Sequence, residues 1–257
     1  MGRFSGHQSS ILRRRAAPIL TCLLVGVLSF GAQAQEEEEK GFSGTAKLGF
    51  AATTGNADTS SLTAGLGTVY AAGRWRHEFT ANALRATADD QDTGESETTA
   101  ERYQAGYQAN WAINDKSYLF GRFNFDRDLF SGFERQITET VGYGRTFIDN
   151  GTHLLAGEVG GGATQQKRND GTDFNQAIAR AAVRYTWNFS ETGSFNQRFS
   201  VEGGSENTLF ESVTEVKATL VGNVGLGLSY TLRNNSDVPE GSASTDTFTA
   251  VTLQYDF

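Results

Sequence analysis

The strongest constraint on the fold is an alternation of apolar and polar residues that begins at Phe42 and continues to the end of the chain. A period of two places successive side chains on opposite faces of a β-strand. The stretch 174–189 shows it most clearly: its odd-numbered residues from Ala177 to Phe189 are all apolar or aromatic, whereas Arg180 and Arg184 fall on the other face. Each alternating stretch is roughly ten residues long, the length with which a tilted strand crosses a bilayer. These segments are therefore predicted to be membrane strands with one lipid-facing and one water-facing side.

The same pattern predicts an all-β fold, an antiparallel transmembrane β-barrel of about twelve strands. Tight turns rich in Gly, Asn and Asp alternate with longer polar loops, as in bacterial outer-membrane barrels with periplasmic turns and external loops. An even number of strands then places both termini in the periplasm. A ten-stranded barrel is the alternative if a weak pair of strands is misassigned, and a soluble β-sandwich or lipocalin-like barrel with an apolar interior is the competing fold. The predicted strands cover residues 42–54, 59–71, 74–87, 98–112, 117–129, 135–147, 153–166, 174–189, 195–204, 211–221, 224–234 and 245–257.

The N-terminal region predicts export. Residues 16–30 are mostly apolar but are fewer than the roughly 20 that a membrane-spanning helix needs. Arginines precede this run, no positive cluster follows it, and Ala32-Gln33-Ala34 supplies the small residues that a signal peptidase accepts. We expect residues 1–34 to be a cleaved signal peptide rather than an anchor, residues 35–41 to be a short acidic periplasmic segment, and residues 42–257 to form the barrel in the cell outer membrane.

The composition excludes several classes of function. The only cysteine, Cys22, lies in the predicted signal peptide, so the mature chain has no disulfide and no thiolate chemistry. A net charge of -8 at pH 7 argues against nucleic acid as a partner, because its binding needs a basic surface. The sequence has no spacing of metal ligands and no nucleotide motif, and Gly160-Gly161-Gly162 and Gly203-Gly204 lie within strands, where glycine allows close packing. We therefore expect no cofactor and no metal.

Charged residues of both signs are predicted to line the barrel interior. A ladder of mixed charge has two interpretations: a salt-bridge network that fills a narrow barrel, or a constriction that selects small solutes or ions. Glu139 departs from the pattern because it shares its face with Ile137 and Val141, so it is predicted to lie near the outer rim, or the register shifts there. The candidate lumen residues are Arg76, Glu78, Arg122, Asp126, Glu158, Arg180, Arg184, Arg198 and Glu202.

An embedded hydrolase with a Ser/His/Asp or Ser/His/Asn site needs a histidine as its base. Only His77 and His153 follow the predicted cleavage site, and both lie near the predicted periplasmic ends of strands, away from the outer leaflet. They are better explained as members of an aromatic girdle at the membrane interface, so no residue is predicted to be catalytic. The aromatic residues predicted to form this girdle are Tyr70, Trp75, Trp111, Tyr118, Phe147, Trp187, Phe189 and Phe195.

Three short motifs carry a resemblance to a known family. They are Phe42 to Phe50 in the first strand, Thr53 to Leu62 with its Thr-Gly-Asn turn, and the terminal Leu253-Gln254-Tyr255-Asp256-Phe257. Together they resemble the DUF481 family of salt-induced outer membrane proteins, and the resemblance covers essentially the whole mature chain. It implies an outer-membrane barrel but supplies no catalytic residues to carry over.

These observations predict a non-enzymatic outer-membrane barrel with a structural or salt-stress role in the envelope, or a narrow channel for small solutes or ions. The alternatives are a lipid-modifying enzyme, and an adhesion or receptor module that uses the acidic external loops. The expected partners are outer-membrane lipid and the barrel-assembly machinery, because a terminal Phe257 on an alternating strand resembles the signal that this machinery recognises.

Overall fold

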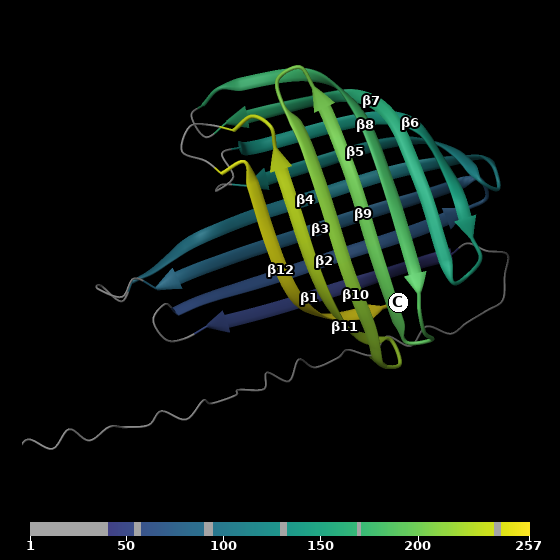
Figure 1. Cartoon of the computed structure of the whole chain (residues 1–257), viewed down its shortest axis with the longest axis horizontal. Helices are drawn as coiled ribbons and strands as arrows, with labels where there is room; N and C mark the ends of the chain where they lie inside the picture. The colour runs from purple at the N-terminus through teal and green to yellow at the C-terminus, as the bar shows by residue number, and fades with distance from the viewer. Residues whose placement is uncertain (1–40, 54–57, 90–94, 129–132, 169–170, 239–242) are drawn as a thin grey trace, which may run out of the picture. The chain divides into compact units, whose positions relative to one another are not determined.

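A computed structural model describes residues 41–53, 58–89, 95–128, 133–168, 171–238 and 243–257. These residues form a closed barrel whose strands follow one another in sequence order, with the last strand paired to the first (Figure 1). Every neighbouring pair is antiparallel, including the closing pair of β1 and β12. The strands are β1 (Gly41–Thr53), β2 (Asp58–Ala72), β3 (Trp75–Asp89), β4 (Ser96–Asn114), β5 (Ser117–Asp128), β6 (Phe133–Asp149), β7 (His153–Arg168), β8 (Asp173–Asn188), β9 (Gly193–Gly204), β10 (Thr208–Val221), β11 (Val224–Asn235) and β12 (Thr245–Asp256).

The predicted fold class is confirmed, with twelve strands rather than ten. β9 and β10 are both present and pair with each other from Thr208–Gly203 to Ala218–Gly193. The largest difference from the predicted bounds is at β10, which begins at Thr208 rather than at 211. Leu209 and Phe210 pair with Glu202 and Val201 of β9, so pairing across the hairpin, and not the alternation along one strand, sets where β10 begins. The predicted signal peptide and nearly all of the acidic segment that follows it lie outside the described residues.

Two kinds of connection distinguish the two ends of the barrel. At one end, here called the turn end, short turns join β2 to β3 and β10 to β11, and Gly73 and Gly222 take positive φ angles of 58° and 52° there. Longer connections occupy the other end, here called the loop end. β1 begins and β12 ends at the turn end, where the Gly44 amide donates to the Phe257 carbonyl at 2.7 Å and the Phe257 amide donates to the Gly44 carbonyl at 2.9 Å. The first and last strands therefore meet on the same side, as the even strand number requires.

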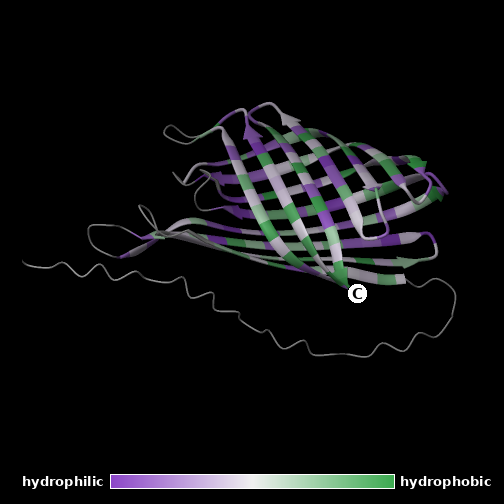
Figure 2. Ribbon diagram, turned by 60° about the horizontal axis from the view of Figure 1, so that its bottom comes forward, coloured by the Kyte–Doolittle hydropathy of each residue, from purple (hydrophilic) through white to green (hydrophobic). Residues whose placement is uncertain are grey.

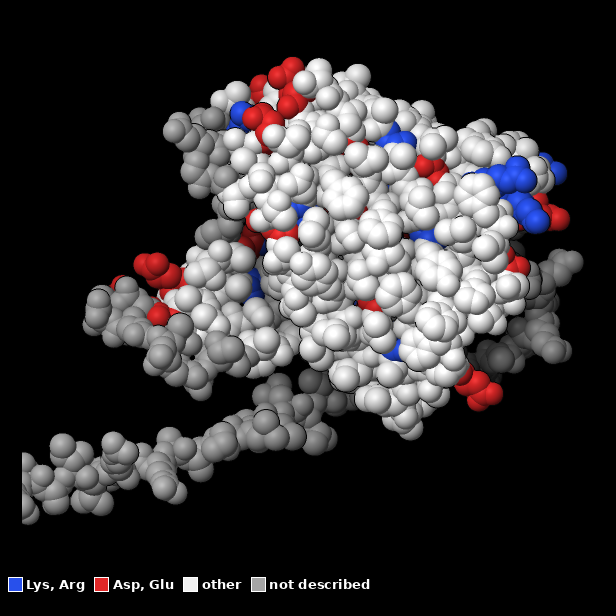
Figure 3. Space-filling model, in the orientation of Figure 1, with Lys and Arg blue, Asp and Glu red and all other residues white. Residues whose placement is uncertain are grey.

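Burial in this barrel is inverted relative to a water-soluble protein. Large apolar side chains lie exposed on the outside, with Phe50 and Val141 both 69% exposed and Leu253 54% exposed. The buried side chains are mainly polar and include Gln254, Thr164 and Arg180, whereas only Phe120, Ala156 and Ile178 are buried among the apolar side chains of the described residues. Hydrophobic and hydrophilic residues alternate along the strands that face the viewer in Figure 2, and the charged residues visible in Figure 3 gather mostly toward the two ends. This inversion is incompatible with the soluble β-sandwich or lipocalin-like alternative, which buries its apolar face.

Backbone spacing in one wall depends on glycine. A side chain at Gly162 would place its Cβ 1.8 Å from the backbone carbonyl oxygen of Glu139 on β6, a distance that no packed structure tolerates. The neighbouring Gly161 has its nearest foreign atom at an ordinary 3.4 Å. The glycine run of β7 therefore permits close approach of β6 and β7 at Gly162, as its place within a strand predicted. No helix in the described part of the chain is long and apolar enough to cross a membrane.

Candidate functional site

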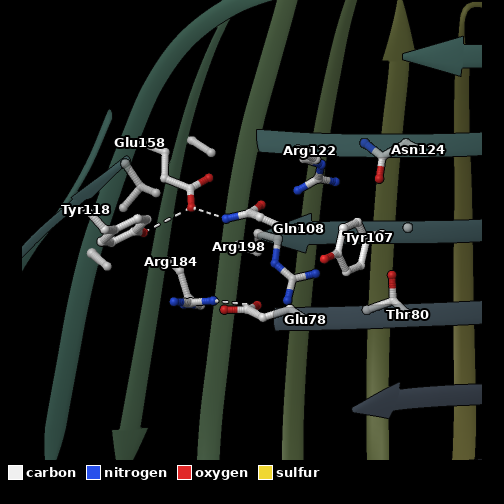
Figure 4. A pocket seen from close by; sticks show the side chains of 14 residues that line it. Glu78, Thr80, Tyr107, Gln108, Tyr118, Arg122, Asn124, Glu158, Arg184 and Arg198 are labelled. Atoms are coloured by element: carbon white, nitrogen blue, oxygen red, sulfur yellow. Dashed lines mark hydrogen bonds and ion pairs between the residues drawn. The ribbon is translucent and has the colours of Figure 1, made fainter. Parts of the chain in front are cut away.

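Charged and polar side chains from opposite walls meet inside the barrel. Gln108 on β4 donates to Glu158 Oε1 on β7 at 2.8 Å, and Arg184 on β8 lies 3.7 Å from Glu78 on β3. β4 is not a neighbour of β7 in the ring, and β3 is not a neighbour of β8. The contacts therefore cross the lumen, and they leave only a small central cavity of about 100 Å³ (Figure 4).

Arg180 is the most enclosed charge of this network. Its side chain is 2% exposed and lies 2.8 Å from Glu158 and 3.4 Å from Glu202, its direct register partner on β9. Tyr118 also donates to Glu158 Oε1 at 3.0 Å, so both oxygens of that carboxylate are occupied. This part of the network is balanced in charge and fills space, which is a structural role.

Three arginines with a different environment surround the central cavity. Arg184 and Arg198 are direct register partners on β8 and β9, and Arg122 reaches the same cavity from β5 (Figure 4). Like charges placed directly opposite each other destabilise a sheet. The Arg122 Nε atom is buried without a hydrogen-bond partner, and no carboxylate among the described residues forms an ion pair with Arg122 or Arg198. Positive charge in this cavity is therefore only partly compensated.

A second cross-lumen network lies near the loop end. Asp126 on β5 accepts from Arg102 on β4 at 2.7 Å and pairs with Arg233 on β11, also at 2.7 Å. β5 and β11 stand on opposite sides of the ring, so this carboxylate bridges the full width of the barrel. Gln104 adds a further hydrogen bond at 3.1 Å.

The nine candidate lumen residues thus fall into two groups. Asp126 belongs to the network near the loop end, whereas the other eight belong to the network of the central cavity. Arg76 joins that network through Glu78 at 2.9 Å, Arg180 through Glu158, and Glu202 through Arg180. Arg102 and Arg233 were missing from the candidates, although both fall on the polar faces of alternating strands. Their importance comes from sharing one carboxylate across the barrel, which no pattern within a single strand reveals.

A third group of charges supports the join between β1 and β12. The direct register of this pair runs only from Thr45–Asp256 to Leu48–Leu253. Inside it, Lys47 on β1 reaches Glu215 on β10 at 2.5 Å, Gln254 donates to the same carboxylate at 2.6 Å, and Lys217 pairs with Asp256. These contacts connect β1 with strands beyond its partner and strengthen a short join.

The two histidines lie on the outer face at the turn end. His77 Nδ1 is 2.8 Å from the Tyr107 hydroxyl and its ring stacks on Trp75, while His153 Nδ1 is 2.9 Å from the Tyr185 hydroxyl and its ring stacks on Trp187. Both positions match the predicted aromatic girdle. A histidine that stacks between aromatic rings and bonds to a phenol has the surroundings of an interfacial anchor rather than those of a hydrolase base.

Two placements on the barrel wall differ from the sequence expectation. Tyr118 was predicted to belong to the outer girdle, but it points into the lumen and contacts Glu158, because it shares parity with Arg122 rather than with Leu119. Glu139 does lie outward and exposed, opposite Phe123 on β5 and Ala163 on β7. The pairing is continuous through this position, so the predicted register shift is wrong and the outward carboxylate is a real feature of the wall.

Among the described residues, no cluster of three or more His, Cys, Asp and Glu side chains could hold a metal ion. The lumen instead combines charges of both signs, with three arginines around the cavity.

Known proteins resemble this chain in structure and in sequence. Among solved structures, the chain is similar to the translocator domain of autotransporter NalP from Neisseria meningitidis, with 11% identity, a TM-score of 0.49, and coverage of 86% of this chain and 90% of that chain. It is also similar to the COG4313 outer membrane channel from Pseudomonas putida F1, with 8% identity, a TM-score of 0.49, and coverage of 87% and 99%.

Sequence comparison identifies relatives more directly. The Escherichia coli (strain K12) protein named "Uncharacterized protein YdiY" is 30% identical over 218 residues, which are 84% of each chain. The family model described as "Protein of unknown function, DUF481" matches residues 46–257, nearly the whole barrel. As its first-strand, turn and terminal motifs predicted, the chain belongs to the DUF481 family.

Proposed function

We propose that this protein is an outer-membrane barrel whose lumen provides a narrow polar passage for small solutes or ions. The observation that carries the proposal is the inverted burial: a closed ring of strands with an apolar outside and a polar, charged inside. In hydrocarbon, unpaired backbone groups cost several kcal/mol each, and a closed barrel pairs them all. The exposed apolar belt would be an aggregation hazard in water and is matched by lipid.

The lumen supports passage of small species only. Contacts such as Gln108–Glu158 and Asp126–Arg233 cross the barrel, and the cavity between them holds about 100 Å³. Side chains rather than an inserted loop narrow the described lumen, and side chains of half-exposed residues such as Arg184 can change rotamer. A selective constriction built from charged side chains is a recognised way to discriminate small ions.

Location and passage are tested separately. The mature chain should fractionate with the outer membrane and migrate differently on gels with and without boiling, as folded barrels do. Single-channel recording of folded protein in planar bilayers should then show small, uniform conductance steps. Folded, heat-modifiable protein that gives no steps at any applied voltage would exclude the passage.

A second candidate function is a closed structural barrel with a role in envelope stress. The observation that favours it is the bridge from Arg102 through Asp126 to Arg233, which ties opposite walls together near the loop end. The two candidates separate on the Asp126→Asn variant: steps seen only after this substitution indicate a barrel that is closed in its native form, whereas steps of the unsubstituted protein indicate a native passage.

We further propose that Phe257 presents the chain to the barrel-assembly machinery. In the folded barrel its backbone pairs with Gly44 and its ring lies 5.9 Å from that of Phe42, so the terminal strand is free for recognition only before closure. Phe257→Ala should slow assembly in cells more than refolding of purified protein into lipid. Equal effects on both would assign Phe257 to closure alone.

A further inference from the structure

The central cavity contains a pair of arginines that folding alone does not explain. Arg184 and Arg198 face each other directly across β8 and β9, and such like-charge pairs cost stability. Four residues further along the same two strands, Arg180 faces Glu202, an opposite-charge pair. The same wall therefore holds one opposite-charge pair and one like-charge pair, and the like-charge pair lies at the cavity.

The third guanidinium adds to this charge instead of relieving it. Arg122 lines the cavity from β5 with a buried Nε that has no hydrogen-bond partner. A buried donor left unpaired destabilises the fold, and more so when the group is charged. A ligand that accepts hydrogen bonds would remove this cost.

The carboxylates of the cavity do not neutralise the three arginines. Glu158 Oε1 accepts from Gln108 at 2.8 Å and from Tyr118 at 3.0 Å, and its Oε2 accepts from Arg180 at 2.8 Å. Glu78 is shared between Arg76 at 2.9 Å and Arg184 at 3.7 Å. Glu202 does not line the cavity and pairs with Arg180. Arg122 and Arg198 are thus left for a group from outside the chain.

We propose that this cavity, between Arg122, Arg184 and Arg198, is a binding site for a small oxyanion, the shared chemistry of inorganic phosphate and short carboxylates. Guanidinium groups present paired N–H donors that match the oxygens of phosphate and carboxylate. A volume of about 100 Å³ exceeds that of one water several-fold, enough for an anion of phosphate or acetate size and too small for a sugar chain. The site rests on the proposed function, because the anion reaches the cavity through the lumen.

Isothermal titration calorimetry tests the site by measuring the affinity of the folded mature barrel in detergent for phosphate and for acetate. Arg198→Gln and Arg122→Gln should each weaken binding about tenfold, the loss of a hydrogen bond to a charged group. Arg135→Gln is the matched control, because Arg135 is exposed on the outer face and carries the same charge. Heat-modifiable migration confirms that each variant is folded. If the two lumen variants bind only phosphate more weakly, the cavity is a phosphate site. If they bind only acetate more weakly, it is a carboxylate site, and if they bind both more weakly, it is a general oxyanion site.

Reversal potentials in a gradient of potassium phosphate separate the site from the passage. We expect preference for anions in the unsubstituted protein, and a fall of several-fold in the anion-to-cation permeability ratio in Arg198→Gln but not in Arg135→Gln. If the unsubstituted protein, Arg198→Gln and Arg135→Gln all conduct with the same permeability ratio and bind the anion equally well, the site is refuted and the passage is retained. Binding that is lost in Arg198→Gln, in a protein without conductance, retains the site and refutes the passage.

Discussion

Two regions of the lumen use arginine in opposite ways. Near the loop end, Arg102 and Arg233 converge on Asp126 from opposite walls, at 2.7 Å each, so each cation has a carboxylate and the barrel gains a cross-brace. At the central cavity, Arg184 and Arg198 face each other and Arg122 has no carboxylate of its own. The difference teaches that the presence of charge in a lumen says little about its role. What distinguishes bracing from binding is whether each charge already has a partner.

The largest expected effect comes from removing the shared carboxylate near the loop end. Asp126→Asn removes the closest counter-charge of two enclosed guanidiniums, which keep only the longer contacts of Arg102 with Asp128 at 3.7 Å and of Arg233 with Glu211 at 3.9 Å. A guanidinium cannot lose its proton to escape. Breaking a buried pair in this way costs about 3 to 5 kcal/mol. The loss is measured as the change in free energy of unfolding when the barrel in lipid vesicles is unfolded with guanidinium chloride. Asp89→Asn, at an exposed strand end, is the control. If the two variants are equally stable, Asp126 is not a brace, and the arginines near the loop end do not differ in role from those of the cavity.

Arg180→Gln is expected to have a smaller effect, although Arg180 is also enclosed and paired. Its partners are carboxylates, which can take up a proton when their cation is lost, and Glu158 keeps its bonds from Gln108 and Tyr118. We expect a loss of about 2 to 3 kcal/mol, near the low end for a broken buried pair. The same unfolding titration checks it. A loss larger than that of Asp126→Asn would mean that bracing is centred on the cavity wall rather than near the loop end.

The packing of the wall itself can be separated from its charges. Gly162→Ala should destabilise the barrel by about 1 to 3 kcal/mol, the usual cost of overpacking, because its Cβ would lie 1.8 Å from the Glu139 carbonyl oxygen. Gly161→Ala should be nearly neutral, since its nearest foreign atom is at 3.4 Å. Both variants keep all lumen charges. Equal stability of the two variants would show that β6 and β7 can move apart. The lumen would then be less rigid than a fixed brace and a fixed cavity require.

The smallest expected effect has the opposite sign. Arg198→Gln relieves the like-charge pair with Arg184, so in chloride buffer without phosphate it should stabilise the barrel by about 0.2 to 1 kcal/mol. Added phosphate should stabilise the unsubstituted protein more than the variant and so narrow or reverse the difference. Unfolding titrations with and without phosphate measure both. Destabilisation by Arg198→Gln in both buffers would place Arg198 among the bracing arginines.

Much of the fold could be predicted from the chain alone. Odd-numbered residues of β8 from Ala177 to Trp187 are apolar and its even-numbered Arg180 and Arg184 are polar, and a strand must put these sets on opposite faces. Turn residues such as Gly73 and Gly222 marked where strands end. Tyr118 shows the limit, because an amphipathic residue near a strand end suits either face, and only the parity of its neighbours in the folded strand assigned it to the lumen.

The sequence by itself predicted about twelve strands with ten as the alternative, their amphipathic faces, the shared side of the two strand ends and the resemblance to the family, because each of these follows from local alternation and from short motifs. The structure decided for twelve. The tertiary structure alone decided which charges meet. Arg102, Asp126 and Arg233 come from β4, β5 and β11, and Arg122, Arg184 and Arg198 from β5, β8 and β9. Which of them meet depends on the offset between neighbouring strands, added up around the whole ring, and on the closure of that ring. No single strand sequence specifies this total offset. Position around the barrel thus decides whether an arginine of an alternating strand joins a brace or lines the proposed anion site.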